Sequence, residues 1–388
     1  MKKMKKDFFK DSSVKFPAYQ PWISNDDKRI VNTVLDQTML TLGPQLEKFE
    51  SDFCKYTKAK YAIAVSNCTA ALHLSLKALG IKETDEVIIP DLTFVADANA
   101  ILACNARPAV VDINKNNFFL SISNLKKNIT KRTKAIIPVH IYGQVCNIDE
   151  VLDIAKANNL KIIEDCAHAI GTFHKSKHVG TIGNTGCFSF YPTKNITTAE
   201  GGMVITNSKS IANKVRQLRN HGMLKSLKSR YTDGYPWVFD VLEPGYNYRL
   251  DEIRCALGIS QLRRVSKINK MRKTAASYYH YKLQNIPGII LPDMVSDKSH
   301  SYHLYTIRVT KSFGMSRNQL FKKLKHAGIR TTVYWMPIHE FTAYNKYVKK
   351  SNVVNTSKIY DEILSLPLFP NISKRHQDAV IKCVKSSK

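Results

Sequence analysis

The chain has 388 residues, of which 44% are hydrophobic and 23% are charged, with 16 Gly and 14 Pro. This composition is typical of a folded globular chain and excludes a disordered one. The length predicts one large and one smaller domain and excludes a small disulfide-stabilised scaffold. Lys and Arg total 59 against 31 Asp and Glu, so the net charge is +28. Such a charge is also found in proteins that bind nucleic acids or membranes.

The basic residues are scattered along the chain, and only 15 of the 59 are Arg, the main base-reading residue. No helix-turn-helix or other nucleic-acid module is visible, so we expect a lysine-rich solvated surface and no nucleic-acid partner. No stretch approaches the roughly 18 apolar residues of a membrane span, and no apolar segment follows the basic start. We therefore expect no membrane partner and a cytoplasmic location.

The cysteines form no Cys-x-x-Cys pair and have no His partners at the spacing of a zinc site. This pattern predicts reduced, mostly buried thiols. No metal site is expected.

A short basic segment, residues 1–20, precedes a region in which apolar runs alternate with helical patterns. The alternation is typical of parallel strands joined by crossover helices, so residues 21–264 are predicted to form a large α/β domain. The predicted strands are 61–66, 86–90, 108–112, 134–140, 161–165 and 203–206. The predicted helices are 69–79, 93–103, 148–157, 208–221 and 249–283.

Residues 265–388 are predicted to form a smaller α+β domain. Its predicted strands are 303–309 and 330–334, and its predicted helices are 317–327, 356–364 and 374–384.

Polar side chains follow several predicted strands, at the edge where an open parallel sheet binds ligands. After strand 61–66, Cys68 and Thr69 open a helix whose backbone N–H groups offer a site for an anion. An ordinary helix cap by Ser66 or Asn67 is the alternative. Phe94 follows strand 86–90 near the same edge, where a place in the hydrophobic core is the alternative.

Asp165 ends strand 161–165, and His168 follows it closely. A carboxylate at the end of a buried strand needs a partner, for which a protonated heterocycle nitrogen and a helix N-cap are the two options. Lys194 follows Ser189 in a short polar segment between two buried strands. Solvated surface is the common place for a lysine in this chain, but a buried one is costly unless it has a task such as Schiff-base formation.

An anion pocket, an aromatic ring, an Asp and a Lys at one edge together meet the needs of pyridoxal 5'-phosphate (PLP). The Lys would hold the cofactor as an imine after losing its proton, which a desolvated site favours. The Asp would keep the ring nitrogen protonated, so that the ring can accept electrons from the substrate carbon. The sequence therefore predicts a PLP enzyme.

In their context these residues resemble the DegT/DnrJ/StrS family of PLP-dependent sugar aminotransferases, which has the aspartate-aminotransferase fold. The resemblance covers nearly the whole chain and includes TLGPQLEKFE, IEDCAHAIGT, FSFYPTKNITTAEGGMV and PGYNYRLDEIRCALGISQL. The Lys followed by Glu-Gly-Gly is its most specific part. EDCAHAIGT and TKNITTAEGG look most like aminotransferases of the UDP-4-amino-4-deoxy-L-arabinose type, and FDVLEPGYNYR is similar to enzymes that aminate other UDP-4-keto sugars.

The resemblance implies three catalytic residues. Lys194 would carry the cofactor, Asp165 would pair with its ring nitrogen, and His168 would lie near its phenolic oxygen. Family dehydratases have His where Lys194 stands, so the resemblance implies transamination. Ala199 stands where Gly is usual before Glu-Gly-Gly.

Further cofactor contacts are also implied by the resemblance. Phe94 would stack on the ring, while Cys68, Thr69 and Ser189 would hold the phosphate. Many relatives have Gly in place of Cys68, which puts the cofactor affinity in question. Asn247 resembles an Asn that the neighbouring subunit lends to the phosphate, so a homodimer with shared sites is implied.

The implied reaction moves an amino group from L-glutamate, which leaves as 2-oxoglutarate, to a nucleotide-linked 4-keto sugar in amino-sugar or cell-surface polysaccharide biosynthesis. Candidate substrate-binding residues, each of which equally suits the core or the surface, are Tyr191, His221, His303, Tyr334, Trp335 and His339. A 3-keto sugar or a keto substrate without a nucleotide is the alternative within this fold. A non-catalytic PLP-binding regulator or a basic nucleic-acid binder is the alternative outside this class.

Overall fold

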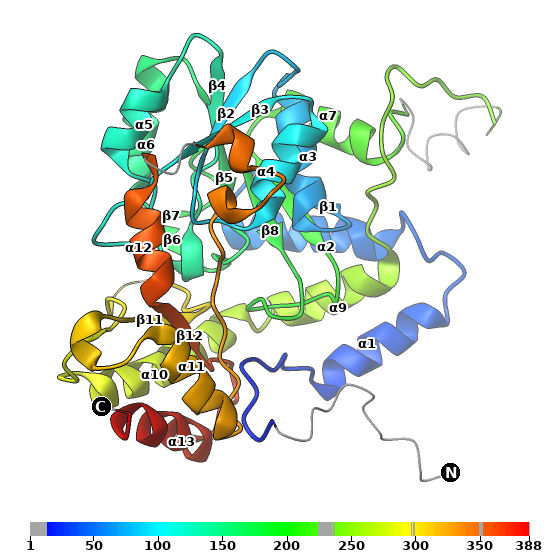
Figure 1. The fold of residues 1–388 in the computed structure, drawn as a ribbon. Coiled ribbons are helices and arrows are strands. Elements are labelled where there is room, and N and C mark those ends of the chain that lie inside the picture. The colour runs from blue at the N-terminus through cyan, green and yellow to red at the C-terminus, as the bar shows by residue number, and fades with distance from the viewer. Residues whose placement is uncertain are drawn as a thin grey trace.

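The computed structural model describes residues 14–223, 235, 237–295, 297, 299–348 and 352–387. Its largest element is a seven-stranded sheet with the strand order β1-β9-β8-β5-β4-β2-β3 (Figure 1). The strands are β1 (Tyr61–Val65), β2 (Glu86–Pro90), β3 (Arg107–Val111), β4 (Thr133–Ile136), β5 (Lys161–Asp165), β8 (Thr185–Ser189) and β9 (Gly202–Thr206). Strands β3, β2, β4, β5 and β8 pair in parallel, and β9 is antiparallel to both β1 and β8. The predicted α/β class with a mostly parallel sheet is confirmed.

Helices cover both faces of this sheet, because successive residues of each buried strand point to opposite sides. Ile63 and Val65 share one hydrophobic core with helices α3, α4 and α7, whereas Ala62 and Ala64 share another with α2 and α9. The helices are α1 (Asn25–Leu35), α2 (Pro44–Thr57), α3 (Cys68–Ala78), α4 (Val95–Ala103), α5 (Ile122–Asn128), α6 (Ile148–Ala157), α7 (Lys209–Arg219) and α9 (Glu252–Leu262).

A second, three-stranded antiparallel sheet has the order β10-β11-β12. It consists of β10 (Ile289–Ile290), β11 (Tyr305–Val309) and β12 (Ile363–Leu366), and it shares a hydrophobic core with α10 (Val265–Leu283), α11 (Arg317–His326) and α13 (Lys374–Lys385). Helix α12 (Val354–Glu362) connects back to β12, and a small hairpin is formed by β6 (Phe173–His174) and β7 (Lys177–His178). Short 3-10 helices are η1 (Ile141–Gly143), η2 (Lys311–Phe313), η3 (Ile338–Glu340) and η4 (Asn345–Tyr347).

Two element predictions are wrong. The helix predicted over 249–283 is two helices, because Arg264 leaves helical geometry with φ −109° and ψ 1° and its guanidinium bonds Asp27 of α1 at 2.6 Å. The strand predicted over 330–334 makes only the isolated bridge Thr332–Ser365. Strand β11 pairs instead with β12. Because β12 begins at Ile363, the last two residues of the helix predicted over 356–364 belong to this strand.

Helix α10 begins at Val265, where the sequence predicts the smaller domain to start, and the division at residue 264 stays a prediction. The described part of the predicted basic extension, residues 14–20, packs beside the second sheet, where Phe16 contacts its hydrophobic core. The Phe16 carbonyl accepts a hydrogen bond from the backbone N–H of Arg330 at 2.9 Å. Residues 1–13 lie outside the described residues.

All eight cysteines are unpaired and six are buried, which confirms the predicted thiols. Among the described residues, no helix is both long and apolar enough to cross a bilayer.

Candidate active site

A cavity of about 680 Å³ lies at the carboxyl ends of strands β5 and β8 of the large sheet. Its lining includes all three predicted catalytic residues, Lys194, Asp165 and His168. Four of the predicted cofactor contacts line it as well: Cys68, Thr69, Phe94 and Ser189. The crossover connections of a parallel sheet bring strand ends to one edge, which is why residues far apart in sequence meet here.

The N-terminus of α3 forms one end of the cavity. Asn67 caps this helix, since its Oδ1 accepts the backbone N–H of Ala70 at 2.8 Å. The first N–H groups of a helix have no partner within it, so those of Cys68 and Thr69 are available to an anion. A Cβ on Gly202 would lie only 2.5 Å from Asn67 and 2.8 Å from the Cys68 nitrogen. Glycine is therefore required where β9 starts, because any side chain would displace this turn.

Lys194 and Asp165 interact electrostatically across the cavity. Burial lowers the pKa of Lys194 to about 8, although the Asp165 carboxylate opposes this shift. Burial raises the pKa of Asp165, while the Ala167 N–H, 2.8 Å from Oδ1, and Lys194 act to lower it. The second Asp165 oxygen accepts no hydrogen bond from the described residues. Lys194 thus loses its proton more readily than an ordinary lysine, and it shares the cavity with a carboxylate that has an unused oxygen.

The ring of His168 is held as a neutral imidazole. Its Nδ1 accepts the backbone N–H of Tyr142 at 3.2 Å, so the ring proton is on Nε2. Burial, together with the nearby Lys194, keeps the pKa of His168 well below its usual range. His168 therefore offers the cavity a hydrogen-bond donor without adding a charge.

Asp97, in the first turn of α4, is a further buried acid that the sequence reasoning missed. It is 0% exposed, and only Oδ2 is satisfied, by the Thr93 hydroxyl at 2.6 Å. Burial and the neighbouring Asp165 raise the pKa of Asp97 well above its ordinary value, which favours the uncharged acid. Its place three residues after Phe94 resembles an ordinary helix position, and no sequence signal distinguishes it.

The predicted substrate residues divide into two groups. Tyr191, Tyr334 and Trp335 line the cavity, and so does Tyr19, which sequence reasoning missed because it lies in the predicted basic extension. The cavity lining does not include three predicted substrate residues, His221, His303 and His339. It also does not include Asn247, which the resemblance implies as a cofactor contact for the neighbouring subunit.

Each residue of the second group has another position. His303 is buried, with its ring centroid 4.3 Å from that of His168. His221 donates its backbone N–H to the Tyr246 carbonyl at 3.0 Å, next to the exposed Asn247. His339 is buried against a carboxylate outside the cavity.

Comparison with known proteins decides the family. Residues 21–385 match the model of the DegT/DnrJ/EryC1/StrS aminotransferase family. The chain belongs to this family. It is a PLP-dependent sugar aminotransferase, and the recognition from sequence is confirmed.

Relatives of the aminotransferase match it along almost its whole length. The spore coat polysaccharide biosynthesis protein SpsC of Bacillus subtilis is 39% identical over 95% of this chain and 96% of its own. PseC of Helicobacter pylori, an aminotransferase of pseudoaminic acid biosynthesis, is 30% identical with a TM-score of 0.89, covering 96% and 98% of the two chains. The putative sugar aminotransferase Spr1654 of Streptococcus pneumoniae is 28% identical with the same coverage; its PMP form has a TM-score of 0.89 and its PLP form 0.87.

The residues of the aminotransferase fit PLP, the cofactor of its family. The turn against Gly202 keeps the N–H groups of α3 clear for a phosphate, and Asp165 has an oxygen free for a ring nitrogen. Ala199 has φ 65°, in the left-handed region that favours glycine. This geometry accounts for the Gly that is usual before Glu-Gly-Gly.

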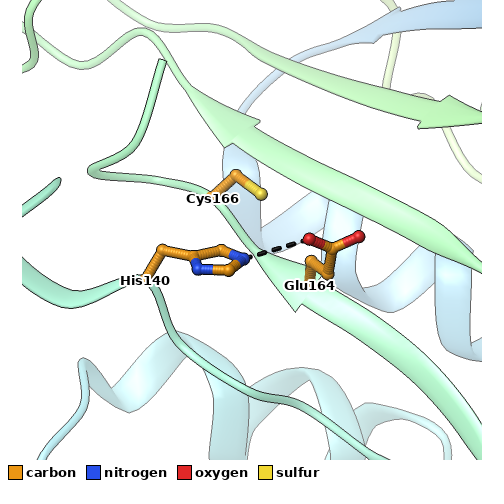
Figure 2. A group of neighbouring side chains, drawn as sticks. All are labelled: His140, Glu164 and Cys166. Atoms are coloured by element: carbon orange, nitrogen blue, oxygen red, sulfur yellow. Dashed lines mark hydrogen bonds and ion pairs between the residues drawn. The ribbon is translucent and has the colours of Figure 1, made fainter. Parts of the chain in front are cut away.

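A buried cluster of His140, Glu164 and Cys166 has the composition of a metal site (Figure 2). The Glu164 carboxylate, however, accepts His140 Nε2–H at 3.0 Å and three backbone N–H groups at 2.6–2.8 Å, those of Gly180, Ile182 and Gly183. His140 Nδ1 is also occupied, because it accepts the N–H of Cys146 at 3.2 Å. Burial raises the pKa of Cys166 to about 12, so it remains a thiol. The cluster is therefore a structural network and not a metal centre.

Proposed function

We propose that the enzyme transfers an amino group from L-glutamate to the keto carbon of a nucleotide-linked 4-keto sugar and releases 2-oxoglutarate. The names of SpsC and PseC refer to the biosynthesis of spore coat polysaccharide and of pseudoaminic acid, and Spr1654 is named as a putative sugar aminotransferase, which supports a sugar substrate. The observation that carries the proposal is a single cavity that joins Lys194 and Asp165 to aromatic residues of separate segments, Tyr19, Tyr191 and Trp335. Its volume of about 680 Å³ lies in the range of small-molecule sites.

Bound PLP supplies an electron sink and a carrier for the amino group. Lys194 acts as the nucleophile and then moves a proton at the substrate carbon, tasks that a pKa of about 8 favours near neutral pH. Asp165 would hold a proton at the ring nitrogen through its unused oxygen. His168 would donate its Nε2–H to the phenolic oxygen without bringing a competing positive charge.

The other cavity residues bind and orient. The N–H groups of Cys68 and Thr69, with the Thr69 and Ser189 hydroxyls, would hold the phosphate. Phe94 is 46% exposed and lines the cavity, where its ring would stack on the cofactor. The net charge of +28 adds a background field that draws a polyanionic sugar nucleotide toward the cavity.

A homodimer with shared sites is part of the proposal. Asn247 is exposed and does not line the cavity of its own chain. Nearby apolar side chains are also exposed, among them Trp237, Val238 and Leu242. Exposed apolar side chains in one stretch are typical of a surface that a partner covers. A second copy would bury them and could bring Asn247 to the neighbouring cavity.

The substrate class is tested with a panel of UDP-, GDP- and dTDP-linked 3-keto and 4-keto sugars, with 2-oxoglutarate release from glutamate as the readout. We expect turnover with 4-keto sugars, and a KM that rises with ionic strength because screening weakens the background field. Turnover restricted to 3-keto sugars or to sugars without a nucleotide would overturn the substrate class. Lys194→Ala is the matched control and should be inactive.

The shared site is tested by mixing two inactive variants, Lys194→Ala and Asn247→Ala. Subunit exchange should restore about a quarter of the wild-type activity, because half of the dimers are hybrids with one intact site. A monomer in sedimentation experiments, or no recovery in proven hybrids, would contradict the proposal.

A further inference from the structure

His339 belongs to a buried contact between two distant parts of the chain. Asp91, directly after β2, is 0% exposed, and His339, in η3, is 1% exposed. The His339 backbone N–H donates to Asp91 Oδ1 at 3.0 Å, and its Nδ1 lies 2.6 Å from Oδ2. The Ile338 N–H donates to the Asp91 carbonyl at 3.0 Å. These contacts hold residues 338–339 in one position relative to the end of β2.

This contact lies close in sequence to two aromatic residues of the cavity wall. Phe94 follows Asp91 by three residues, and Trp335 precedes His339 by four. The two rings line the cavity with their centroids 4.6 Å apart and their planes inclined by 41°. The position of residue 339 at the strand end therefore limits where Trp335 can lie relative to Phe94.

A second anchor holds the other side of Trp335. The hydroxyl of Tyr142 donates a hydrogen bond to the carbonyl of Tyr334. Trp335 is thus fixed between this anchor and the contact at His339. Of the two, only the contact at His339 also fixes the loop that carries Phe94.

Asp91, His339 and Ser357 are in contact in the same sequence as the acid, the base and the nucleophile of a catalytic triad, but Ser357 does not line the cavity. His339 Nε2 lies 3.3 Å from Ser357 Oγ and 3.0 Å from Glu340 Oε1. The Ser357 hydroxyl, within α12, bonds the Val353 carbonyl at 3.2 Å and does not line the cavity. A buried ion pair also adds little net stability compared with apolar side chains of the same size. Neither catalysis at Ser357 nor stability alone accounts for the pair.

We propose that Asp91 and His339 are positioning residues that hold Trp335 against Phe94 and so shape the cavity wall that meets the sugar substrate. The identity of that substrate rests on the proposed function above. The position of Trp335 does not, and it can be measured separately.

The test compares His339→Leu with the unchanged enzyme as full-length holoenzyme. In a Trp22→Phe, Trp237→Phe background, Trp335 is the only tryptophan of the chain. We expect its fluorescence to become more accessible to acrylamide in His339→Leu. Without the fluorescence background, KM for the keto sugar should rise about ten-fold. A change in kcat of less than about three-fold should accompany it, because the reacting groups are untouched.

Asp112→Asn is the matched control. Asp112 is buried at the end of the neighbouring strand β3 and accepts from the Thr356 N–H and hydroxyl, both at 2.8 Å. Asp112 is hydrogen-bonded to α12, and among the described residues no hydrogen bond joins it to Trp335 or Phe94, so quenching and KM should change much less than in His339→Leu. His339→Asn, which keeps an N–H donor for Asp91, should restore much of the wild-type behaviour.

Unchanged quenching in His339→Leu, or equal changes in Asp112→Asn, would overturn the proposal. Asp91→Asn keeps the side-chain volume and gives the same readouts if His339→Leu does not fold. If 4-keto sugars are not substrates, the wild-type enzyme fails the kinetic assay too, while the quenching result still decides the positioning role.

Discussion

Strand β5 carries two adjacent buried carboxylates with opposite properties. Glu164 and Asp165 are 0% and 6% exposed and point to opposite faces of the sheet. Glu164 accepts four hydrogen bonds, and those from His140, Gly183 and Gly180 hold its pKa below the usual range although burial opposes them. Asp165 accepts one, from Ala167, and burial raises its pKa.

The difference shows how to separate structural acids from functional ones. A buried carboxylate whose oxygens are all satisfied stabilises the protein itself, and it has no capacity left for a ligand. A buried carboxylate with an unused oxygen beside a cavity is costly in the free protein, and a ligand can offset that cost. The first kind should lose stability on substitution, and the second should lose activity.

The largest expected effect is that of Asp165→Asn on catalysis. An amide cannot keep a proton on the ring nitrogen, so kcat/KM should fall by about 10³-fold, within the range for removing an acid–base group. Stability should be unchanged or improved, because a buried charge is removed. Steady-state kinetics and urea unfolding of the same preparation check both parts. A large loss of stability would contradict the comparison.

Glu164→Gln should have the reverse profile. Breaking a buried, hydrogen-bonded pair with His140 should cost about 3 kcal/mol of unfolding free energy. Gly180 and Gly183 donate to this carboxylate, so the loop before β8 should loosen as well. Urea unfolding measures the loss, and the folded fraction should keep most of its kcat. A stable but inactive variant would assign Glu164 to the chemistry instead.

A pH-dependent effect on stability is expected from Lys194. Its pKa is about 8 in the folded protein and 10.5 when unperturbed, so the unfolded chain binds more protons between these values. The free energy of unfolding therefore rises with pH in this window, by about 2 kcal/mol after allowing for the part of the side chain open to the cavity.

The measurement is urea unfolding of cofactor-free protein at pH 7 and pH 10. Lys194→Met should be the more stable protein at pH 7, and its advantage should largely disappear at pH 10. An advantage that is equal at both values would mean that Lys194 keeps an ordinary pKa. Adding Asp165→Asn should lower the pKa of Lys194 further, because the neighbouring negative charge is gone.

The sequence predicts local features of this molecule better than long-range ones. Strand β5 and helix α6 have the bounds expected from their apolar patterns, and Lys194 and Asp165 were placed together because parallel strand ends share an edge. The break between α9 and α10 carries no Gly or Pro signal, since it depends on the contact of Arg264 with Asp27.

Long-range contacts also escape sequence-based prediction at the candidate site. His339 has the residue type of a substrate ligand, but its partner Asp91 lies 248 residues away. Tyr19 and Asp97 had no motif around them, and only the packing of distant segments brings them to the cavity or beside Asp165. Residue type and strand position therefore predict where chemistry occurs, whereas tertiary packing decides which neighbouring side chains take part.

The smallest expected effect is that of His168→Gln. His168 is neutral, and its ring is oriented by the Tyr142 N–H, so its contribution is one hydrogen-bond donor and no charge. A glutamine amide can supply that donor, and kcat/KM should fall by less than about ten-fold, whereas His168→Phe should cost roughly a further 1–2 kcal/mol of transition-state stabilisation. Neither variant should alter the pH profile near neutrality, because burial keeps the pKa of the imidazole well below its usual range. A lost acidic limb in His168→Gln would show that His168 carries a proton in the reaction, and the neutral role argued from its geometry would fail.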